Sequence, residues 1–394
     1  MSDDLAKKIR QFARTLPYKT APYSKRNWGH PLHSLCSYQG KLKPALAHWL
    51  VEMFTEDGST VLDPLGGVGT IPFAASLLGR VGISNDLSPL AHAVATGKVC
   101  APTSGEVEAA LTRLSRGMQL ESVTSEDLNA ATFGLNGSVA DFYHEQTLNE
   151  VLRARRYFLQ LDADSSDLFV KACVLHVLHG NRPYALSRTS HPITPFHPTG
   201  VATYKPLVEH ARARAKLAFK NALPQRFRRG LSTLGSYLDL PALRLPKADS
   251  IITSPPFPGM RFDRPNWLRL WFCGWSAEDF HLTSMSFLER QQLLSLDVYR
   301  DFFEVSSELL RENGLLVLHL GGAETHEMVA HLTNLANARF EVREIVKEDV
   351  SSLEHHGVRD KGLTKTHEFI FATRRAQSKI SSSGRMAKSL LTRA

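Results

Sequence analysis

The sequence predicts an α/β fold, a doubly wound sheet with a largely helical region inserted into it. Residues 58–86 contain a short apolar run, a glycine-rich turn, a helical pattern and a second apolar run that ends in an acid. This is the order of a strand–helix–strand unit. Strand-like runs return in ADSIITSPPF and LLVLHLGG, so we expect the sheet to continue there. Between these parts, from about residue 103 to 230, apolar residues recur with helical spacing.

Each element follows from a local pattern, taken in chain order. PYKTAPYSKRNW indicates an irregular arm, and ALAHWLVEMF has helical spacing up to Asp57-Gly58. Helices are predicted by EVEAALTRLSRGM, TLNEVLRARRYFLQL, DLFVKACVLHVLHG, YKPLVEHARARAKLAFKNAL and YRDFFEVSSELLRENG. FEVREIV and HEFIFATRR predict two late strands, and the serine-rich, acid-free end of the chain favours disorder. We therefore expect a basic arm (1–30), a sheet domain in two segments (31–102 and 236–375), a helical insertion (103–235) and a disordered basic tail (376–394).

Composition excludes several classes of protein. The chain has 394 residues, 43% hydrophobic and 22% charged, with no apolar run of membrane-spanning length and no secretory signal. We expect a cytoplasmic protein without a membrane partner. The four cysteines form no C-x-x-C pair, and His176 and His179 have no evident carboxylate or cysteine partner, so we expect neither disulfides nor a metal. The net charge of +8 suits a polyanionic partner.

A glycine-rich turn after the first predicted strand indicates a ligand site. Asp63-Pro64-Leu65-Gly66-Gly67-Val68-Gly69-Thr70 lies between the run STVL and a helix, where glycines let the backbone approach a ligand and helix amides face it. The turn has neither the spacing of a dinucleotide site nor the ending of a phosphate loop. An acid before the glycines suits a positively charged ligand without phosphate. Asp86, at the end of the next apolar run, can accept both hydroxyls of a ribose.

The segment Ser254-Pro255-Pro256-Phe257 indicates the second half of the site. It follows the buried-type strand SIIT, and the strand must stop there because proline cannot donate to a sheet ladder. The prolines hold the backbone rigid, so the Ser254 hydroxyl and the Pro255 carbonyl point away from the sheet, beside an aromatic ring on which a base can stack. These oxygens are suitable acceptors for both hydrogens of an exocyclic amino group, whose nitrogen then attacks a methyl sulfonium.

Together these segments resemble the amino-group DNA methyltransferases. DPLGGVGT resembles motif I of that family, TSPPF resembles its motif IV, and YQGKLKPALAHWLV is more loosely similar to motif X. The resemblance implies a seven-stranded, Rossmann-like sheet that binds S-adenosylmethionine and a flipped base. It assigns the base to Ser254, Pro255, Pro256 and Phe257, and the cofactor to Asp63, Pro64, Gly66, Gly67, Gly69, Thr70, Asp86, Tyr38, Lys41 and Pro44. The chain has no Pro-Cys dipeptide, which sets aside the ring-carbon cytosine methyltransferases.

The same resemblance narrows the substrate. A serine at the first position of the tetrapeptide is commoner in enzymes that act on cytosine N4, and an aspartate or asparagine is commoner in enzymes that act on adenine N6, so Ser254 favours cytosine. The order of motifs is similar to the class whose target-recognition region lies between motifs I and IV. That order implies that residues 103–235 recognise a specific sequence in double-stranded DNA. A cognate restriction endonuclease is a further partner that the resemblance leaves open.

Two groups of basic residues are candidate DNA contacts. In the loop HGNRPYALSRTSHPITPF, Arg182 and Arg188 can reach guanine. The second group contains no acid and can contact phosphates; its members are Arg212, Arg214, Lys216, Arg226, Arg228 and Arg229. The alternative for the first group is a packed polar loop. The alternative for the second group is a solvated helix face followed by a loop.

Two other functions stay open at this point. Related Pro-Pro-aromatic tetrapeptides occur in RNA methyltransferases, although these typically begin with Asp or Asn and have an RNA-binding module. A nucleic-acid-binding protein on an inactive methyltransferase fold is the non-enzyme alternative. The intact Asp63, turn glycines and Ser-Pro-Pro unit favour an active enzyme.

Overall fold

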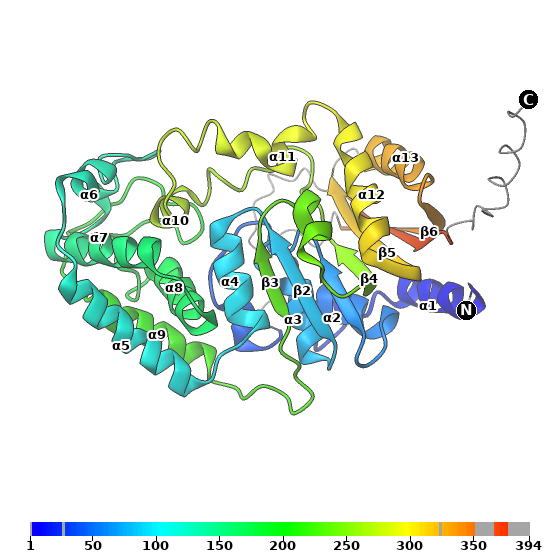
Figure 1. Ribbon diagram of the computed structural model, residues 1–394, viewed down its shortest axis with the longest axis horizontal. Helices are drawn as coiled ribbons and strands as arrows, with labels where there is room; N and C mark the ends of the chain where they lie inside the picture. Colours follow the sequence, from blue (N-terminus) through cyan, green and yellow to red (C-terminus); the bar gives the residue numbers. More distant parts are fainter. Residues whose placement is uncertain (1, 26–27, 323–324, 351–365, 377–394) are drawn as a thin grey trace, which may run out of the picture.

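A seven-stranded sheet forms the centre of the computed structural model, which describes residues 2–25, 28–322, 325–350 and 366–376 (Figure 1). The strands are β1 (Thr60–Asp63), β2 (Val81–Asp86), β3 (Leu231–Leu234), β4 (Ala248–Thr253), β5 (Leu310–Gly322), β6 (Phe340–Asp349) and β7 (Thr366–Arg374). Their order is β3-β2-β1-β4-β5-β7-β6. The first five strands in this order, β3, β2, β1, β4 and β5, pair in parallel, and β7 is antiparallel to β5 and β6. This is a doubly wound order with one antiparallel strand inserted near an edge, which confirms the predicted fold class.

Helices cover both faces of the sheet and form a lobe at one side of it (Figure 1). They are α1 (Ser2–Thr15), α2 (Pro44–Phe54), α3 (Thr70–Leu77), α4 (Pro89–Val99), α5 (Ser104–Leu120), α6 (Ser125–Ala130), α7 (Glu145–Gln160), α8 (Ser165–Val177), α9 (Leu207–Ala218), α10 (Trp267–Phe272), α11 (Leu288–Gln291), α12 (Tyr299–Leu309) and α13 (Thr325–Ala336). Among the described residues, no helix combines the length and apolar character needed to cross a membrane.

Alternate residues of the central strands face two separate cores, because successive side chains of a strand point to opposite faces of a sheet. Leu62 and Ile251 pack with residues of α12 and α13 on one face. Val61 and Ile252 pack with residues of α1, α2 and α3 on the other. The two layers of helices fix the sheet between them, so the ends of its strands form a stable platform for a site.

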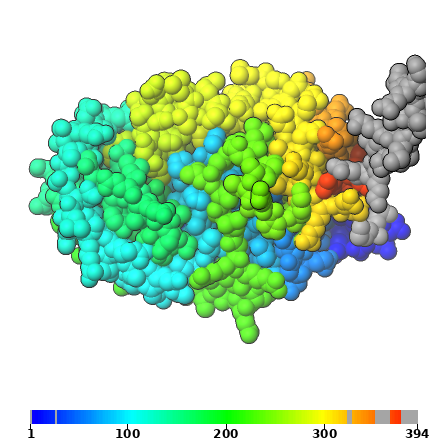
Figure 2. Space-filling view, viewed as in Figure 1, coloured from blue at the N-terminus to red at the C-terminus, as the bar shows by residue number. Residues whose placement is uncertain are grey.

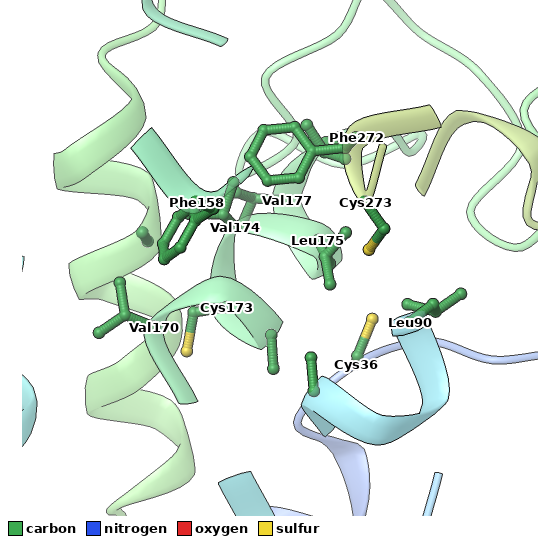
Figure 3. Packing of buried hydrophobic residues seen from close by; sticks show 14 of the residues in the cluster. Cys36, Leu90, Phe158, Val170, Cys173, Val174, Leu175, Val177, Phe272 and Cys273 are labelled. Carbon is green, nitrogen blue, oxygen red and sulfur yellow. The ribbon is translucent and has the colours of Figure 1, made fainter. Parts of the chain in front are cut away.

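The helical insertion shares a hydrophobic core with the sheet domain. One cluster joins Phe73 of α3 and Leu90 of α4 to Cys173 of α8 and Phe272 of α10. Figure 3 shows Leu90, Cys173 and Phe272 together with Cys36, which comes from the segment before α2. On the face shown in Figure 2, the insertion (cyan to green) adjoins the segment after β4 (yellow). Because the core is continuous, the insertion is held rigidly beside the sheet.

The insertion also ends earlier than we predicted. Leu231–Leu234, which we assigned to it, form β3 and pair with Ile83–Asp86 at one edge of the sheet. The run LSTL is short and largely exposed, so it lacks the apolar pattern by which a buried strand is detected.

The basic arm that we predicted for residues 1–30 begins with a docked helix, whereas the described part of the PYKTAPYSKRNW segment is irregular apart from a 3-10 turn at Pro17–Lys19. Helix α1 contacts β6 and α2, and Ile9, Phe12 and Tyr18 are buried in the core that contains Val61. Leu5, Ile9 and Phe12 recur with helical spacing and so lie on one face of α1. The many bases of the segment obscured this pattern. We predicted a disordered tail over residues 376–394. Residues 377–394 lie outside the part of the chain that the structure describes.

We expect Phe12→Ala to lower the free energy of unfolding by about 3–5 kcal/mol. The Phe12 ring is fully buried and lies 5.3 Å from the Phe369 ring and 5.7 Å from the Phe54 ring, centroid to centroid. Urea denaturation measures the change, with Phe196→Ala as a control because 54% of Phe196 is exposed. Equal midpoints for the two variants would contradict the docking of α1.

Candidate active site

The carboxyl ends of β1 and β4 meet where the strand order reverses. Leu62 of β1 pairs with Ile251 of β4 in parallel register. Asp63 and the segment after Thr253 therefore emerge at the same side of the sheet, where the carboxyl ends of its parallel strands lie. In open α/β sheets, ligands bind in the crevice at this switch point. The glycine turn and the Ser-Pro-Pro segment, far apart in the sequence, are therefore brought together there.

The end of β2 holds the glycine turn in place. Gly66 N donates to Asn85 O (2.8 Å), and Gly67 N donates to Asp86 Oδ2 (2.8 Å). Asn85 Nδ2 also donates to Pro64 O (3.2 Å). These bonds tie the turn to the strand that carries Asp86.

Packing explains why the turn requires glycine. A Cβ at Gly66 would overlap Ser84 Oγ, and a Cβ at Gly69, where φ is +68°, would lie 2.9 Å from Ala95 Cβ. Gly67 has φ +51° and faces open space. Thr70 follows as the first, buried residue of α3. The turn thus presents bare backbone to the space at the edge of the sheet.

Two carboxyl groups beside the turn have raised pKa values. Burial raises the pKa of Asp63 to about 7, although Leu65 N donates to its Oδ1 (3.2 Å). Burial raises the pKa of Asp86 to about 6, against the stabilising N–H groups of Ser88 (2.8 Å) and Gly67. A nearby positive charge would favour the ionised form of both groups.

The Ser-Pro-Pro-Phe segment is fixed by neighbouring elements. Ser254 Oγ lies 3.0 Å from His319 Nδ1, at the end of β5. Pro255 is buried, and Pro256 O accepts a hydrogen bond from Gln292 Nε2 (3.0 Å). The Phe257 ring lies 5.5 Å from the His319 ring at an interplanar angle of 63°. The segment is therefore a rigid, partly exposed ledge beside the glycine turn.

The motif X region contributes one side chain to the site. The Tyr38 ring stacks on Phe262 at 5.9 Å and 17°, and burial, with the charges of Asp86 and Glu289, raises the pKa of its hydroxyl. Tyr38 therefore lies near the end of β2. Burial lowers the pKa of Lys41, whose Nζ donates to His33 O (2.7 Å).

The structure shows contacts within the protein for Lys41 and Pro44, the two residues of this segment for which we also predicted cofactor contacts. The ammonium of Lys41 is occupied by a main-chain carbonyl, so it supports the loop before α2. Pro44 is the first residue of α2, a position where the missing N–H of proline has no helical partner to lose.

Five residues of the site were not predicted from the sequence. They are Phe262, Glu289, Gln292, His319 and His367. Burial raises the pKa of Glu289 to about 7, with further contributions from the charges of Asp86 and Asp263. A histidine within the apolar run LLVLHL was a signal for His319. Nothing in the sequence marks Phe262 or Glu289, because their placement depends on the path of the loops after β4.

The basic segment before β3 lies at the end of the strands opposite the candidate site. Arg228 N donates to Ser76 O (3.1 Å), and its guanidinium lies near Gly58, which precedes β1. In Figure 1 this segment is the loop that runs below the sheet from α9 to β3. Arg226, Arg228 and Arg229 are exposed at the amino ends of the strands, opposite the edge that carries Asp63.

Of the other predicted DNA contacts, Arg214 and Arg212 have partners within the protein. Arg214 is buried and donates to the main-chain oxygens of Leu35 (3.1 Å) and Ser34, so it cannot reach DNA. Arg212 pairs with Glu108 (3.0 Å). Lys216 is exposed on α9.

Arg188 has a similar internal role. Its guanidinium donates to Gly200 O (2.8 Å) and Asp141 O (3.1 Å), and so joins two loops. Arg188 uses its Nε and Nη1 groups in these two hydrogen bonds, and its contact to DNA stays a prediction. The DNA contact predicted for Arg214 is corrected, since its buried guanidinium donates to main-chain carbonyls.

Arg182 is connected to the segment that carries Tyr38 through a row of side-chain contacts. It is exposed, and its guanidinium lies 6.0 Å from the centroid of the Tyr184 ring. Tyr184 stacks on His176 (5.3 Å, 24°), and His176 Nδ1 accepts a hydrogen bond from Ser37 N (3.2 Å), next to Tyr38.

Comparisons with known proteins add little. No family model matches the chain, and no curated protein matches its sequence. Among solved structures, it is similar to TrmN from Thermus thermophilus (TM-score 0.34, 13% identity, 88% of this chain) and covers 52% of that chain, about half its length. It is also similar to two structures of the rRNA methyltransferase aviRa from Streptomyces viridochromogenes. Their TM-scores are 0.31 and 0.33, with 12% and 11% identity over 87% and 90% of this chain and 91% and 93% of theirs. At these scores the likeness carries no argument about function.

Proposed function

We propose that the protein transfers a methyl group from S-adenosylmethionine to the exocyclic amino group of a base in double-stranded DNA, with cytosine N4 favoured. One observation carries the proposal. The Ser254–Phe257 segment and the Gly66–Gly69 turn lie at the same switch point of a doubly wound sheet, where such sheets bind ligands.

The residues of the turn fit the cofactor. Asp86 has two partly exposed carboxylate oxygens at the end of β2, each with lone pairs left to accept a ribose hydroxyl. Gly67 faces open space, and the buried Asp63 carboxyl suits a ligand with a positive charge. When bound, S-adenosylmethionine supplies a methyl group on a sulfonium, an electrophile that needs no metal.

The ledge after β4 fits an amino group on a flat ring. The lone pair of such a nitrogen is delocalised into the ring, so it becomes nucleophilic only when acceptors hold its two hydrogens. Ser254 Oγ and the Pro255 carbonyl oxygen are the acceptors that we assign. Phe257 and the stacked pair of Tyr38 and Phe262 offer aromatic faces for a flipped base.

Ser254 favours cytosine among the bases, and the charge of the chain suits a nucleic acid as substrate. The resemblance described above associates this serine with cytosine N4, and the net charge of +8 suits a polyanion. Arg182 is exposed, with its guanidinium 6.0 Å from the centroid of the Tyr184 ring, and is the contact to DNA that we retain. The rigid helical lobe beside the sheet is the region to which we assign recognition of the DNA sequence.

The affinity for S-adenosylmethionine should increase by roughly tenfold or more between pH 5.5 and 8. The pKa values of about 7 for Asp63 and about 6 for Asp86 mean that both groups are largely protonated at the lower pH and ionised at the higher one. Ionised Asp63 attracts the positive charge of the ligand, and ionised Asp86 is the stronger acceptor for the ribose hydroxyls. Calorimetry at several pH values measures the change. Asp63→Asn, which cannot ionise, should flatten the part of the curve near pH 7, and a wild-type affinity independent of pH would refute the assignment.

Arg182→Glu should weaken DNA binding by roughly fivefold to twentyfold, since charge reversal removes one contact and adds repulsion. Arg228→Glu is the matched control, because Arg228 is also exposed but lies at the opposite edge of the sheet. Fluorescence anisotropy at a fixed salt concentration compares the two variants. An equal or larger effect of Arg228→Glu would place the DNA on the other edge.

A labelling experiment tests the proposed function. The purified protein is incubated with radiolabelled S-adenosylmethionine and, in parallel, with unmethylated DNA from several genomes or with total RNA. The polymers are digested and the nucleosides separated. Label in N4-methylcytosine is expected, whereas label in N6-methyladenine would keep the enzyme class and overturn the inference from Ser254. Label only in RNA would overturn the assignment to DNA, and bound cofactor without any transfer would favour a nucleic-acid-binding protein.

A further inference from the structure

Ser254 and His319 form a pair at the centre of the candidate site. Strands β4 and β5 are parallel with Thr253 opposite Leu318, so the next residue of each strand lies beside the other. Ser254 Oγ is 3.0 Å from His319 Nδ1 and 3.2 Å from the main-chain oxygen of His319. The imidazole and the main-chain carbonyl of His319 thus both contact the Ser254 hydroxyl.

The positions of the hydrogens follow from these two contacts. A carbonyl has no hydrogen, so the 3.2 Å contact requires Ser254 to donate its only one. Nδ1 is then the donor in the 3.0 Å contact; the opposite roles, with Ser254 donating to Nδ1, would place the N–H on Nε2. Burial holds the pKa of His319 well below its usual range, so the ring is neutral and its single N–H is the one on Nδ1. Nε2, which has no partner among the described residues, is left as a bare acceptor, and this is better tolerated in the interior than an orphaned N–H.

The imidazole has little freedom to turn. The residue is 2% exposed. Its ring lies 4.9 Å from the Phe369 ring and 4.6 Å from the His367 ring, the second at an interplanar angle of 86°. His367 Nδ1 is in turn 3.7 Å from Glu348 Oε2. The donor on Nδ1 therefore has a fixed direction relative to Ser254.

We infer that His319 is a positioning residue that locks the Ser254 hydroxyl, through its Nδ1–H and its carbonyl, so that the remaining lone pair of Ser254 Oγ faces the target amino group only as an acceptor. The inference deepens the proposed function and rests on it. A freely rotating hydroxyl could donate its hydrogen to the lone pair of the target nitrogen and block attack. A hydroxyl whose hydrogen is held by a carbonyl cannot.

His319 keeps its proton throughout the reaction in this account. The lone pair of the amino nitrogen forms the N–C bond, the C–S bond breaks with its electrons going to sulfur, and the nitrogen releases one proton to water. His319 is therefore not a general base, and a side chain that donates from the same place without titrating should replace it.

Two substitutions test this role by their kinetics. His319→Phe keeps the ring and removes the donor, and we expect kcat to fall at least about tenfold. The KM for DNA and the Kd for the cofactor should stay within about threefold of wild type, since His319 acts only on the reacting group. His319→Asn, whose amide nitrogen can reach the place of Nδ1, should recover kcat to within about threefold. His92→Phe is the matched control, because His92 pairs with Ser232 (3.2 Å) outside the site. An unchanged kcat in His319→Phe, or a His319→Asn variant that folds and binds cofactor but is as slow as His319→Phe, would overturn the inference.

The tautomer of His319 provides a test that does not depend on activity. Nitrogen NMR of the full-length protein labelled in its histidines, with His319→Asn to assign the signal, should show a neutral ring protonated at Nδ1. An unprotonated Nδ1 or a charged ring would overturn the positioning role and leave the proposed function standing. A protein with the expected tautomer that methylates no nucleic acid would instead contradict the proposed function, and with it the role that rests on it.

Discussion

Ser254→Ala is expected to lower kcat for methyl transfer by at least about 100-fold, the effect of removing one preorganised hydrogen-bonding group at a reacting centre. The change removes one of two acceptors for the amino hydrogens, so the nitrogen lone pair stays in the ring. Cofactor binding should be unchanged, because Ser254 lies on the ledge after β4 and contacts His319, not the glycine turn. Single-turnover kinetics with saturating cofactor and DNA measure the effect.

A control variant separates this effect from a general loss of serine hydroxyls. Ser307 donates only to Glu304 O (2.8 Å) within α12, so Ser307→Ala should retain full activity. If Ser254→Ala transferred methyl groups at the wild-type rate, the ledge would not be the place where the base is held.

Asp86→Ala is expected to raise the Kd for S-adenosylmethionine by roughly 100-fold, the sum of lost ribose hydrogen bonds and a loosened turn. Asp86 accepts from Gly67 N and Ser88 N, both at 2.8 Å, so its carboxylate both binds the ligand and shapes the turn. Calorimetry measures the affinity, and Asp239→Ala, an exposed carboxylate on the segment after β3, is the control. Equal affinities for the two variants would remove Asp86 from the cofactor site.

The sequence predicted the parts of the site in which local chemistry determines geometry. The turn around Gly66 requires glycine wherever β1, β2 and α3 pack in this way, and two prolines after β4 must end the strand. Sheet physics then places both segments at one edge, because β1 and β4 are parallel neighbours. No knowledge of distant contacts was needed for these predictions.

The remaining parts depend on contacts between segments far apart in the chain. Arg214 and Lys216 are both basic residues of the same helical pattern. Arg214 is nevertheless buried and donates to a main-chain carbonyl, whereas Lys216 is exposed. Phe12 lies in a segment rich in bases, and only the core beneath it shows that α1 is docked. His319 reaches Ser254 through the register of β4 and β5, which a single sequence does not specify.

The chemical position of the methyl group in the product nucleoside tests the central claim most directly. Mass spectrometry and NMR of nucleosides from DNA methylated by the purified protein would locate it. The account predicts a methyl group on an exocyclic amino nitrogen, with cytosine N4 expected and adenine N6 still consistent with two acceptors at Ser254 and Pro255. A methyl group on a ring carbon, a ring nitrogen or a sugar oxygen would contradict it, because those atoms have no pair of amino hydrogens for the ledge to accept.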